Sequence, residues 1–304
     1  MAGIRANFAA LLTPGFREIF NDKFQEVPMQ MEKLFHVDTS EKDSEKDSAI
    51  SGFGLAVQTG EGAPISYEDP VQGYTTTYIH LKYTKGFKIS REMYEDDLYG
   101  IMKKRPAALG RTMNRTIENQ AAGVFNNGFN TSYLGGDSKV LFSTVHPRPD
   151  GGNSQSNASS TGITLNETNL ETAILAMRNQ LDDKGQKIDV YPKTILVPIA
   201  LRKTAHLIID SPLRQGTADN DVNYYKDEFS IIDWIYLTST SAWFLIDPGV
   251  HELTWFWRER PQFKDDELFD TEYAVYKSTM RFSRLWSDWR GLYGSQGDGA
   301  AYSN

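Results

Sequence analysis

The strongest helical pattern in the chain lies between residues 94 and 128. Apolar side chains recur there at intervals of three or four residues, at Leu98, Met102, Leu109, Met113, Ile117, Ala121, Val124 and Phe125. Such a stripe is typical of an amphipathic helix that packs one face on a sheet. Proline is best tolerated in the first turn, so a helix is predicted to restart at Pro106. It should end at Asn126-Asn127-Gly128, about 30 Å further along.

Residues 50–90 predict a long β-hairpin. From 74 to 83, apolar and polar positions alternate with the period of a strand. Glycine and proline residues between 59 and 70 mark the turn region. A two-stranded hairpin of this length is only marginally stable by itself in water. It is therefore expected to lie on the body of its own chain or on a neighbouring subunit.

Residues 1–49 predict an arm followed by a linker. Leu11, Leu12, Phe16, Phe20 and Phe24 have helical spacing, but Pro14-Gly15 interrupts them, so the arm is expected to be extended or partly helical. Small and charged residues fill 40–48. Such a composition buries little apolar surface and predicts a solvated linker or the mobile base of a loop.

The second half of the chain predicts an α/β lobe. A Gly/Asn/Ser-rich stretch within 131–162 is the best lobe boundary. Thr164 and Glu167 have the spacing of a capping box at the start of a helix. Further elements follow in order: strands at 194–198, 231–237 and 242–246, a helix at 199–210, and closing strands at 252–258 and 272–282. The tail from Gly294 is rich in small residues and is expected to be mobile.

Composition narrows the function. The chain has 304 residues, no cysteine and a net charge of −8. Without cysteine there is no disulfide, thiolate nucleophile or cysteine-bound metal. An acidic chain with no basic stripe is not expected to grip nucleic acid tightly. No apolar run approaches the roughly 20 residues that span a bilayer, and the first residues lack the apolar segment of a signal peptide.

The residues that could carry chemistry form no recognisable site. The histidines are scattered; His146 is the one worth naming as a base, but no nucleophile accompanies it, so a structural role is predicted. Two acidic runs, at 182–183 and 265–267, could bind a hard cation but are interpreted as solvated charges. The six tryptophans could form a sugar-binding platform, although core or subunit contacts are favoured. No catalytic, cofactor-binding or metal-binding residue is predicted, and no cofactor.

The order of elements resembles a known fold. An arm, a long hairpin, a long helix, a glycine-rich junction and an α/β lobe are arranged as in the Hong Kong 97-type fold of tailed-phage major capsid proteins. Within that group the chain is similar to the Mu-type major head subunits. The resemblance lies in 126–129 (NNGF), 141–147 (LFSTVHP), 195–198 (ILVP), 242–247 (AWFLID), 281–282 (RF) and 288–291 (DWRG).

This resemblance implies an α+β capsid fold with five parts. They are an N-terminal arm and linker at 1–49, an extended loop at 50–90, a peripheral domain at 91–162 and 251–293 with a spine helix at about 106–127, an axial domain at 163–250, and a flexible tail at 294–304. The extended loop would lie across the adjacent subunit, and the axial domain would meet its copies at the centre of each capsomer.

The function that the resemblance implies is structural, not enzymatic. Copies would assemble as hexamers and pentamers into an icosahedral virion shell around the double-stranded DNA of a tailed bacteriophage, in the host cytoplasm. Neighbouring capsomers, a portal, a separate scaffolding protein and a decoration protein are the expected partners, with no sequence-specific DNA binding and no membrane. Two alternatives stay open: an encapsulin-like compartment shell, and a carbohydrate-binding β-rich module or hydrolase.

Overall fold

A computed structural model describes residues 8–90, 92–93, 96, 100–213, 221–268, 273–302 and 304. Its helices are α1 (Phe8–Gln25), α2 (Met31–Leu34), α4 (Lys104–Asn126), α5 (Glu167–Arg178) and α6 (Arg202–Ile209), with short 3-10 segments at Ile101–Lys103 and Ile199–Leu201. Its strands are β1 (His36–Thr39), β2 (Ser44–Ile50), β3 (Gln72–Ile79), β4 (Leu81–Ser90), β5 (Thr194–Val197), β6 (Ser230–Asp233), β7 (Trp243–Ile246), β8 (Leu253–Leu268), β9 (Tyr273–Trp286) and β10 (Leu292–Ser295).

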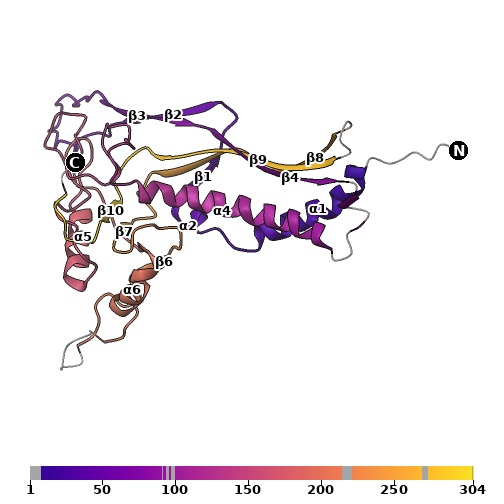
Figure 1. Cartoon of the computed structure of the whole chain (residues 1–304). Coiled ribbons are helices and arrows are strands. Elements are labelled where there is room, and N and C mark those ends of the chain that lie inside the picture. The colour runs from indigo at the N-terminus through magenta and orange to yellow at the C-terminus, as the bar shows by residue number, and fades with distance from the viewer. Residues whose placement is uncertain are drawn as a thin grey trace.

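A four-stranded sheet and the long helix α4, which packs along it, form two layers that make up the larger of the two lobes. The strands lie in the order β1-β8-β9-β4, and Figure 1 shows α4 running along one face of this sheet with α1 at its far end. Large side chains such as Trp255 and Phe282 leave the sheet on that face and are completely buried, as is Ile117 of α4. The predicted amphipathic stripe therefore meets an aromatic sheet face, and burial of this stripe stabilises both elements.

A second sheet forms the core of the other lobe, with the strand order β10-β7-β5-β6. Alternate residues of β5 and β7 point to two separate clusters: Leu196 and Phe244 join the main core, whereas Ile195 and Leu245 pack on the side of α5 and α6. Because both faces are buried, these strands read as continuous apolar runs rather than as alternating ones. Figure 1 shows α5 and α6 projecting away from α4 at this end of the molecule.

The N-terminal segment differs from the predicted arm. From Phe8 to Gln25 it is one helix that continues through Pro14 and packs on its own chain. The rings of Phe16 and Phe20 are buried against Tyr276 and Phe263, at centroid distances of 5.2 and 5.4 Å. A proline inside a helix costs about 3 kcal/mol, and the burial of two phenylalanines, at about 1.5–3 kcal/mol each, offsets it.

One glycine sets how closely the two long helices approach. A Cβ atom at position 110 of α4 would lie 2.5 Å from the carbonyl oxygen of Phe20 in α1. Real side chains do not tolerate such a contact with backbone, so only glycine allows α1 to lie this close to α4. The local sequence pattern contained no sign of this requirement.

The hairpin is also paired differently from the prediction. Its first strand is β2, from the charged segment interpreted as a solvated linker, and it pairs antiparallel with β3. The strand β4 leaves the hairpin and pairs along its whole length with β9 of the four-stranded sheet. The side chains of β2 are all exposed or half-buried. Its sequence, SEKDSAI, shows no alternation of apolar and polar residues. Backbone hydrogen bonds to β3 hold it in place.

Other expectations were met more closely. The helix α4 has Pro106 in its first turn and ends at Asn126, as predicted; Leu98 lies outside the described residues. The strands predicted at 194–198, 242–246, 252–258 and 272–282 are present, whereas the one predicted at 231–237 ends at Asp233. The cap of α5 is Asn166, whose side chain accepts a hydrogen bond from the backbone N–H of Asn169, and not Thr164.

The C-terminal tail is packed where the prediction made it mobile. Gly294 and Ser295 belong to β10, which pairs with β7. Further on, the Ser143 hydroxyl donates a hydrogen bond to the Asn304 backbone carbonyl at 2.9 Å. Sheet pairing, which depends on a strand 50 residues away, could not be recognised in the small residues of the tail. Within the described part of the chain, no helix combines the length and apolar character needed to cross a membrane.

Candidate functional site: the loop between β2 and β3

The loop that joins β2 to β3, residues 51–71, exposes large apolar side chains. Tyr67 is 90% exposed and Leu55 78%, and three more are similar: Phe53, Val57 and Ile65, each at 71–73%. Isolated surface apolar residues are common, but a cluster of this size within one segment marks an interaction surface.

Only a few polar contacts restrain this loop. The backbone N–H of Ser51 donates to the carbonyl oxygen of Val71 at 2.9 Å. The carboxylate of Glu68 accepts a hydrogen bond from the backbone of Gly54 at 2.8 Å and an ion pair from Lys184 of the second lobe at 2.6 Å. The bond from Lys184, followed by that from Gly54, lowers the pKa of Glu68.

The base of the hairpin is fixed firmly to the sheet. Tyr78 of β3 is buried; its hydroxyl hydrogen-bonds Ser287 at 2.7 Å and its ring packs edge-on against Phe256 at 5.0 Å. Burial raises the pKa of Tyr78 to about 12. Beside it, His80 contacts the hydroxyl of Ser283 at 3.0 Å. Figure 1 shows β2 and β3 on the side of the four-stranded sheet opposite α4. A rigid base therefore carries an exposed loop.

The loop is acidic as well as apolar. It contains Glu61, Glu68 and Asp69, and no lysine or arginine occurs between Lys46 and Lys82. Like charges along one segment repel each other and favour a contact surface that is itself locally free of acidic groups.

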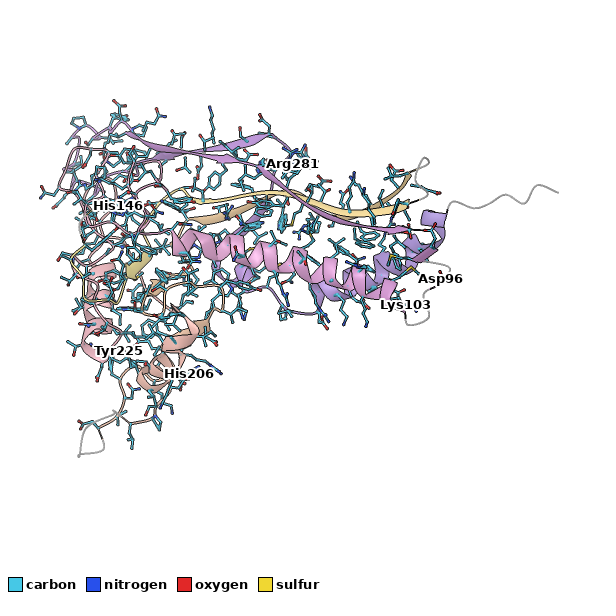
Figure 2. All side chains as sticks on the ribbon, viewed as in Figure 1. Asp96, Lys103, His146, His206, Tyr225 and Arg281 are labelled. Atoms are coloured by element: carbon cyan, nitrogen blue, oxygen red, sulfur yellow. The ribbon has the colours of Figure 1, made fainter. Side chains whose placement is uncertain are left out.

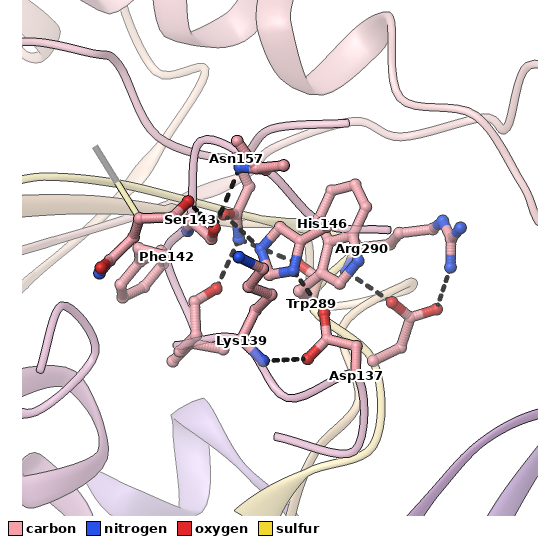
Figure 3. A network of polar contacts seen from close by, with 12 residues as sticks. Asp137, Lys139, Phe142, Ser143, His146, Asn157, Trp289 and Arg290 are labelled. Atoms are coloured by element: carbon pink, nitrogen blue, oxygen red, sulfur yellow. Dashed lines mark hydrogen bonds and ion pairs between the residues drawn. The ribbon is translucent and has the colours of Figure 1, made fainter. Parts of the chain in front are cut away.

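His146, the single histidine that the sequence raised as a candidate base, lies in a buried polar network (Figure 3). Its Nδ1 is 2.6 Å from a carboxylate oxygen of Asp137, and its Nε2 is 3.1 Å from the side-chain oxygen of Asn157. The ring stacks on Trp289 with a centroid distance of 4.4 Å.

Both nitrogens of the His146 ring therefore have partners, and one face of the ring is covered by Trp289. Asn157 also donates to the Leu141 carbonyl oxygen and accepts from the backbone N–H of Ser143, so it ties its own segment to residues 141–143. A general base must reach the proton that it removes, and both nitrogens of His146 already have partners. This geometry favours the structural role predicted for His146. Figure 2 shows the position of His146, near the end of the molecule opposite α1.

The acidic pair 182–183 was interpreted as solvated, and this is wrong for Asp183. Its carboxylate accepts a hydrogen bond from Arg290 at 2.8 Å, and Arg290 also pairs with Asp288 at 2.7 Å. Burial disfavours the charged guanidinium, but the two carboxylates outweigh it and raise the pKa of Arg290. Asp182 accepts from backbone N–H groups of its own turn.

The acidic run 265–267 and the six tryptophans, the remaining candidates for a binding site, do not form one. Asp265, Asp266 and Glu267 are consecutive residues of β8, so their side chains alternate between the two faces of the sheet. Across the described ranges, acidic and histidine side chains form no group that could hold a metal ion. All six tryptophans are buried, so they do not form a surface platform for sugars.

Sequence reasoning missed one buried site on α4. Glu118 is buried; its carboxylate accepts hydrogen bonds from the backbone N–H of Met31 at 3.1 Å and from the indole N–H of Trp234 at 2.6 Å. Asn114, one turn earlier, donates to backbone carbonyl oxygens of Phe24 and Val27. A signal was present, because Asn114 and Glu118 are polar residues four apart beside the apolar stripe.

Comparison with known proteins identifies the family. The model of the phage capsid protein family matches residues 73–295, most of the chain. The chain belongs to the phage capsid protein family. It is therefore a structural protein of the capsid shell, with the Hong Kong 97-type fold that the resemblance implied. No curated protein sequence matches the chain.

Solved capsid structures share the fold at low identity. The capsid of bacteriophage JBD30 matches with 17% identity and a TM-score of 0.55, over 71% of this chain and 95% of that one. The capsid of Cyanophage P-SCSP1u matches with 11% identity and a TM-score of 0.58, over 91% and 88%. A virus-like particle from Pyrococcus furiosus matches with 9% identity and a TM-score of 0.56, over 93% and 98%. The fold thus occurs in more than one kind of shell, and the family match identifies the phage capsid.

Proposed function

We propose that this capsid protein assembles as hexamers and pentamers into the icosahedral shell of a tailed bacteriophage, around its double-stranded DNA. The shell would form in the host cytoplasm and contact the DNA without reading its sequence, because the chain is acidic overall. Self-association would be its whole activity, and no chemical step is assigned to it.

The observation that carries the proposal is the exposed apolar loop at 51–71. In a monomer, five large apolar side chains that are at least 71% exposed would stay in contact with water and would not stabilise the fold, so their exposure indicates an interaction surface. In a shell, each loop can lie across the adjacent subunit, and repetition over many copies gives strong overall binding from modest individual contacts.

The two lobes suggest a division of roles within a capsomer. The peripheral domain, 91–162 and 251–293, would contain β8, β9 and α4, with α4 as its spine helix; β1 and β4, which complete the four-stranded sheet, come from outside these ranges. The axial domain, 163–250, would contain α5, α6 and the strands β5, β6 and β7, and would meet its copies at the centre of the capsomer; β10, the fourth strand of this sheet, comes from outside the range. Figure 2 shows His206 and Tyr225 within this second lobe.

Other expected partners are the portal, a separate scaffolding protein and neighbouring capsomers. One similar capsid, that of bacteriophage JBD30, is decorated with trimers of a minor capsid protein. By analogy, a decoration protein would bind the outside of the present shell.

The experiment that tests the proposal is assembly of the purified protein, with and without a co-expressed scaffolding protein, followed by negative-stain microscopy. Shells or capsomer rings are expected. In parallel, the loop at 51–71 should be cleaved rapidly by a nonspecific protease in free subunits and protected in shells. A clean monomer under every assembly condition would contradict the proposal, and equal cleavage in both states would contradict the role of the loop.

Two alternatives are less well supported. A compartment shell that encloses enzyme cargo shares the fold, but the family match is to phage capsid proteins. Genes for a portal and a terminase beside this one would favour the phage, whereas a cargo enzyme would favour the compartment. The carbohydrate-binding module depended on exposed tryptophans, and these are buried.

A further inference from the structure

The face of the four-stranded sheet that points away from α4 carries more positive than negative charge. Along β4, β9 and β8 its residues alternate with those buried against α4. At the paired positions of this basic face, five side chains are cationic and two are carboxylates: Lys82, Lys88, Lys264, Lys277 and Arg281 against Glu259 and Asp266. Figure 2 shows Arg281 on this side of the sheet. Strand pairing thus assembles the face from segments that are far apart in the sequence.

Two pairs of like charges lie directly opposite each other in the basic face. Lys82 of β4 is paired with Arg281 of β9, and Lys277 of β9 is paired with Lys264 of β8. Like charges opposite each other on neighbouring strands destabilise a sheet. Among the described residues, only Lys264 of these four cations forms an ion pair, with Glu259 at 3.7 Å. The fold therefore contains a repulsion that a bound anion would relieve.

Protection of the sheet edge accounts for only part of this pattern. Lysines on an edge strand keep a sheet from pairing with other chains, and this role accounts for Lys82 and Lys88 because β4 is an edge strand. The strand β9, however, lies between β8 and β4. Its two cations, Lys277 and Arg281, have no edge to protect. Local features that oppose the stability of a fold are typical of functional surfaces.

The basic face is open to solvent. Four of its five cations are exposed, and Arg281 is half-buried. Opposite Lys277 lies Gly86, which adds no side chain beside the ammonium group. A Cβ atom at position 86 would lie 2.6 Å from the carbonyl oxygen of Tyr276, so the packing of the two strands requires this gap. The middle of the face is therefore accessible from the side of β4.

The strand β2 shows which chemistry is compatible with this side of the sheet. Its residues Glu45 and Asp47 are two apart and lie on the same side of the strand. Asp47 accepts a hydrogen bond from the hydroxyl of Ser287. Burial, followed by the charge of Arg281, lowers the pKa of His80, whereas the charge of Glu45 raises it. An extended segment with acidic residues at alternate positions therefore already lies beside this part of the sheet.

We propose that the basic face binds an acidic, extended segment of a separate protein. Carboxylates at positions i and i+4 of such a segment lie about 13 Å apart on one side. The Lys82–Arg281 and Lys277–Lys264 pairs are also separated by four residues along β9, so each pair would receive one carboxylate. The residue between them would lie over the hydroxyl of Thr84, which can donate a hydrogen bond. The inference goes beyond the proposed shell function and can be tested on free subunits.

Duplex DNA fits the basic face less well than an acidic protein segment does. DNA carries one negative charge per about 1.7 Å of its axis, and the chain as a whole has a net charge of −8. Repulsion from the rest of the chain therefore opposes the approach of DNA. A short acidic segment contacts the face alone and needs only local complementarity of charge.

The test measures binding of a short, labelled peptide of alternating glutamate and serine to the purified chain, by fluorescence anisotropy at low salt. Lys82→Gln/Lys277→Gln removes one cation from each like-charged pair. The matched control, Lys85→Gln/Lys203→Gln, removes the same charge from the other side of β4 and from α6. The first variant should bind the peptide about fivefold or more weakly, and the control less than about twofold. Equal losses in both variants, or no binding to the wild type, would overturn the proposal.

Two further results would assign the basic face to a different occupant and would also overturn the proposal. One is tighter binding of a DNA duplex than of the peptide, weakened by Lys82→Gln/Lys277→Gln. The other is loss of shell assembly in this variant while the control still assembles, which would make the face a contact between copies of the chain. If the wild type forms no shells, the proposed function fails, but binding of the peptide can still be measured.

Urea denaturation at low salt separates loss of the binding face from loss of the fold. Lys277→Gln removes a like-charge opposition, so the midpoint of unfolding should equal that of the wild type or rise slightly. The peptide should raise the midpoint of the wild type more than that of the Lys82→Gln/Lys277→Gln variant, because a ligand stabilises the state that it binds. A clearly lower midpoint for Lys277→Gln would show that Lys277 stabilises the sheet and would overturn the argument from repulsion.

Discussion

Two phenylalanines show how differently this capsid protein uses the same side chain. Phe263 of β8 is 7% exposed and packs on Phe20 of α1, whereas Phe53 in the loop between β2 and β3 is 73% exposed. Burial of apolar surface stabilises whichever state removes it from water. Phe263 therefore stabilises the folded subunit, and Phe53 can contribute only when another molecule covers it.

The same contrast extends to whole regions. The sheet with α4 is held by aromatic packing and by buried polar groups with partners, whereas the loop is restrained by hydrogen bonds between Ser51 and Val71 and between Gly54 and Glu68, and by one ion pair. Substitutions in the body should change the stability of the subunit, and substitutions in the loop should change assembly. The predictions below test this separation, in order of decreasing effect on the free energy of unfolding.

Trp255→Ala should have the largest effect. Trp255 is fully buried and stacks on Phe282 at a centroid distance of 4.2 Å. Truncation of a buried tryptophan leaves a cavity and costs about 3–5 kcal/mol of unfolding free energy, measurable by urea denaturation of the subunit. The matched change Phe53→Ala should cost less than about 0.5 kcal/mol. Similar losses for both would break the comparison between core and loop.

Acid should weaken the body through His251. The ring is buried and its Nδ1 accepts from the backbone N–H of Leu253 at 3.2 Å. Burial, with a smaller contribution from His36, lowers the pKa of His251 from 6.5 to about 4. As pH falls through this window the unfolded chain binds a proton and the folded one does not. At about 1.4 kcal/mol per unit, roughly 3 kcal/mol of stability should be lost between pH 6.5 and 4.

Urea denaturation across this pH range measures the effect. His251→Gln should reduce the pH dependence, and His206→Gln, a change at a half-exposed side chain on α6, should leave it as in the wild type. If His206→Gln flattens the dependence and His251→Gln does not, the assignment to His251 is wrong.

Glu118→Gln should destabilise the subunit by about 1–3 kcal/mol, because the amide offers one acceptor oxygen to the two donors, Met31 N–H and Trp234 indole N–H. Burial raises the pKa of Glu118. Its stabilising contribution is therefore largest below the ordinary carboxyl pKa and falls as pH rises through the raised value. Thermal unfolding of wild type and variant at several pH values measures both effects. The absence of any pH-dependent difference would contradict the raised pKa.

Glu68→Gln should have the smallest effect on unfolding. It weakens the contact between the loop and Lys184, so the loop of the free subunit should be cleaved faster by a protease. The midpoint of urea unfolding should stay at the wild-type value, because the pair lies at the surface and the loop is not part of the core. A lower midpoint would show that the loop belongs to the cooperative unit.

Elements whose burial pattern is local could be predicted from the amino-acid sequence. The stripe on α4, the apolar runs of β5 and β7 and the alternation in β8 and β9 could each be read from neighbouring positions, because side-chain periodicity follows directly from helix and strand geometry. The resemblance over these segments also led to the capsid fold.

Features that depend on partners far along the chain became visible only in the folded protein. Ser44–Ile50 has no alternation of apolar residues. It forms a strand because its backbone N–H and C=O groups pair with those of β3. Pro14 lies inside a helix because Phe16 and Phe20 are buried by Tyr276 and Phe263, which lie 260 and 243 positions further along the chain. Three polar side chains are buried because each has a hydrogen-bond partner from a distant part of the chain or a separate loop position. Arg290 binds Asp183, Asp137 binds His146, and Trp234 binds Glu118. A polar group can be buried only where a partner replaces water, and the identity of that partner is a property of the folded chain.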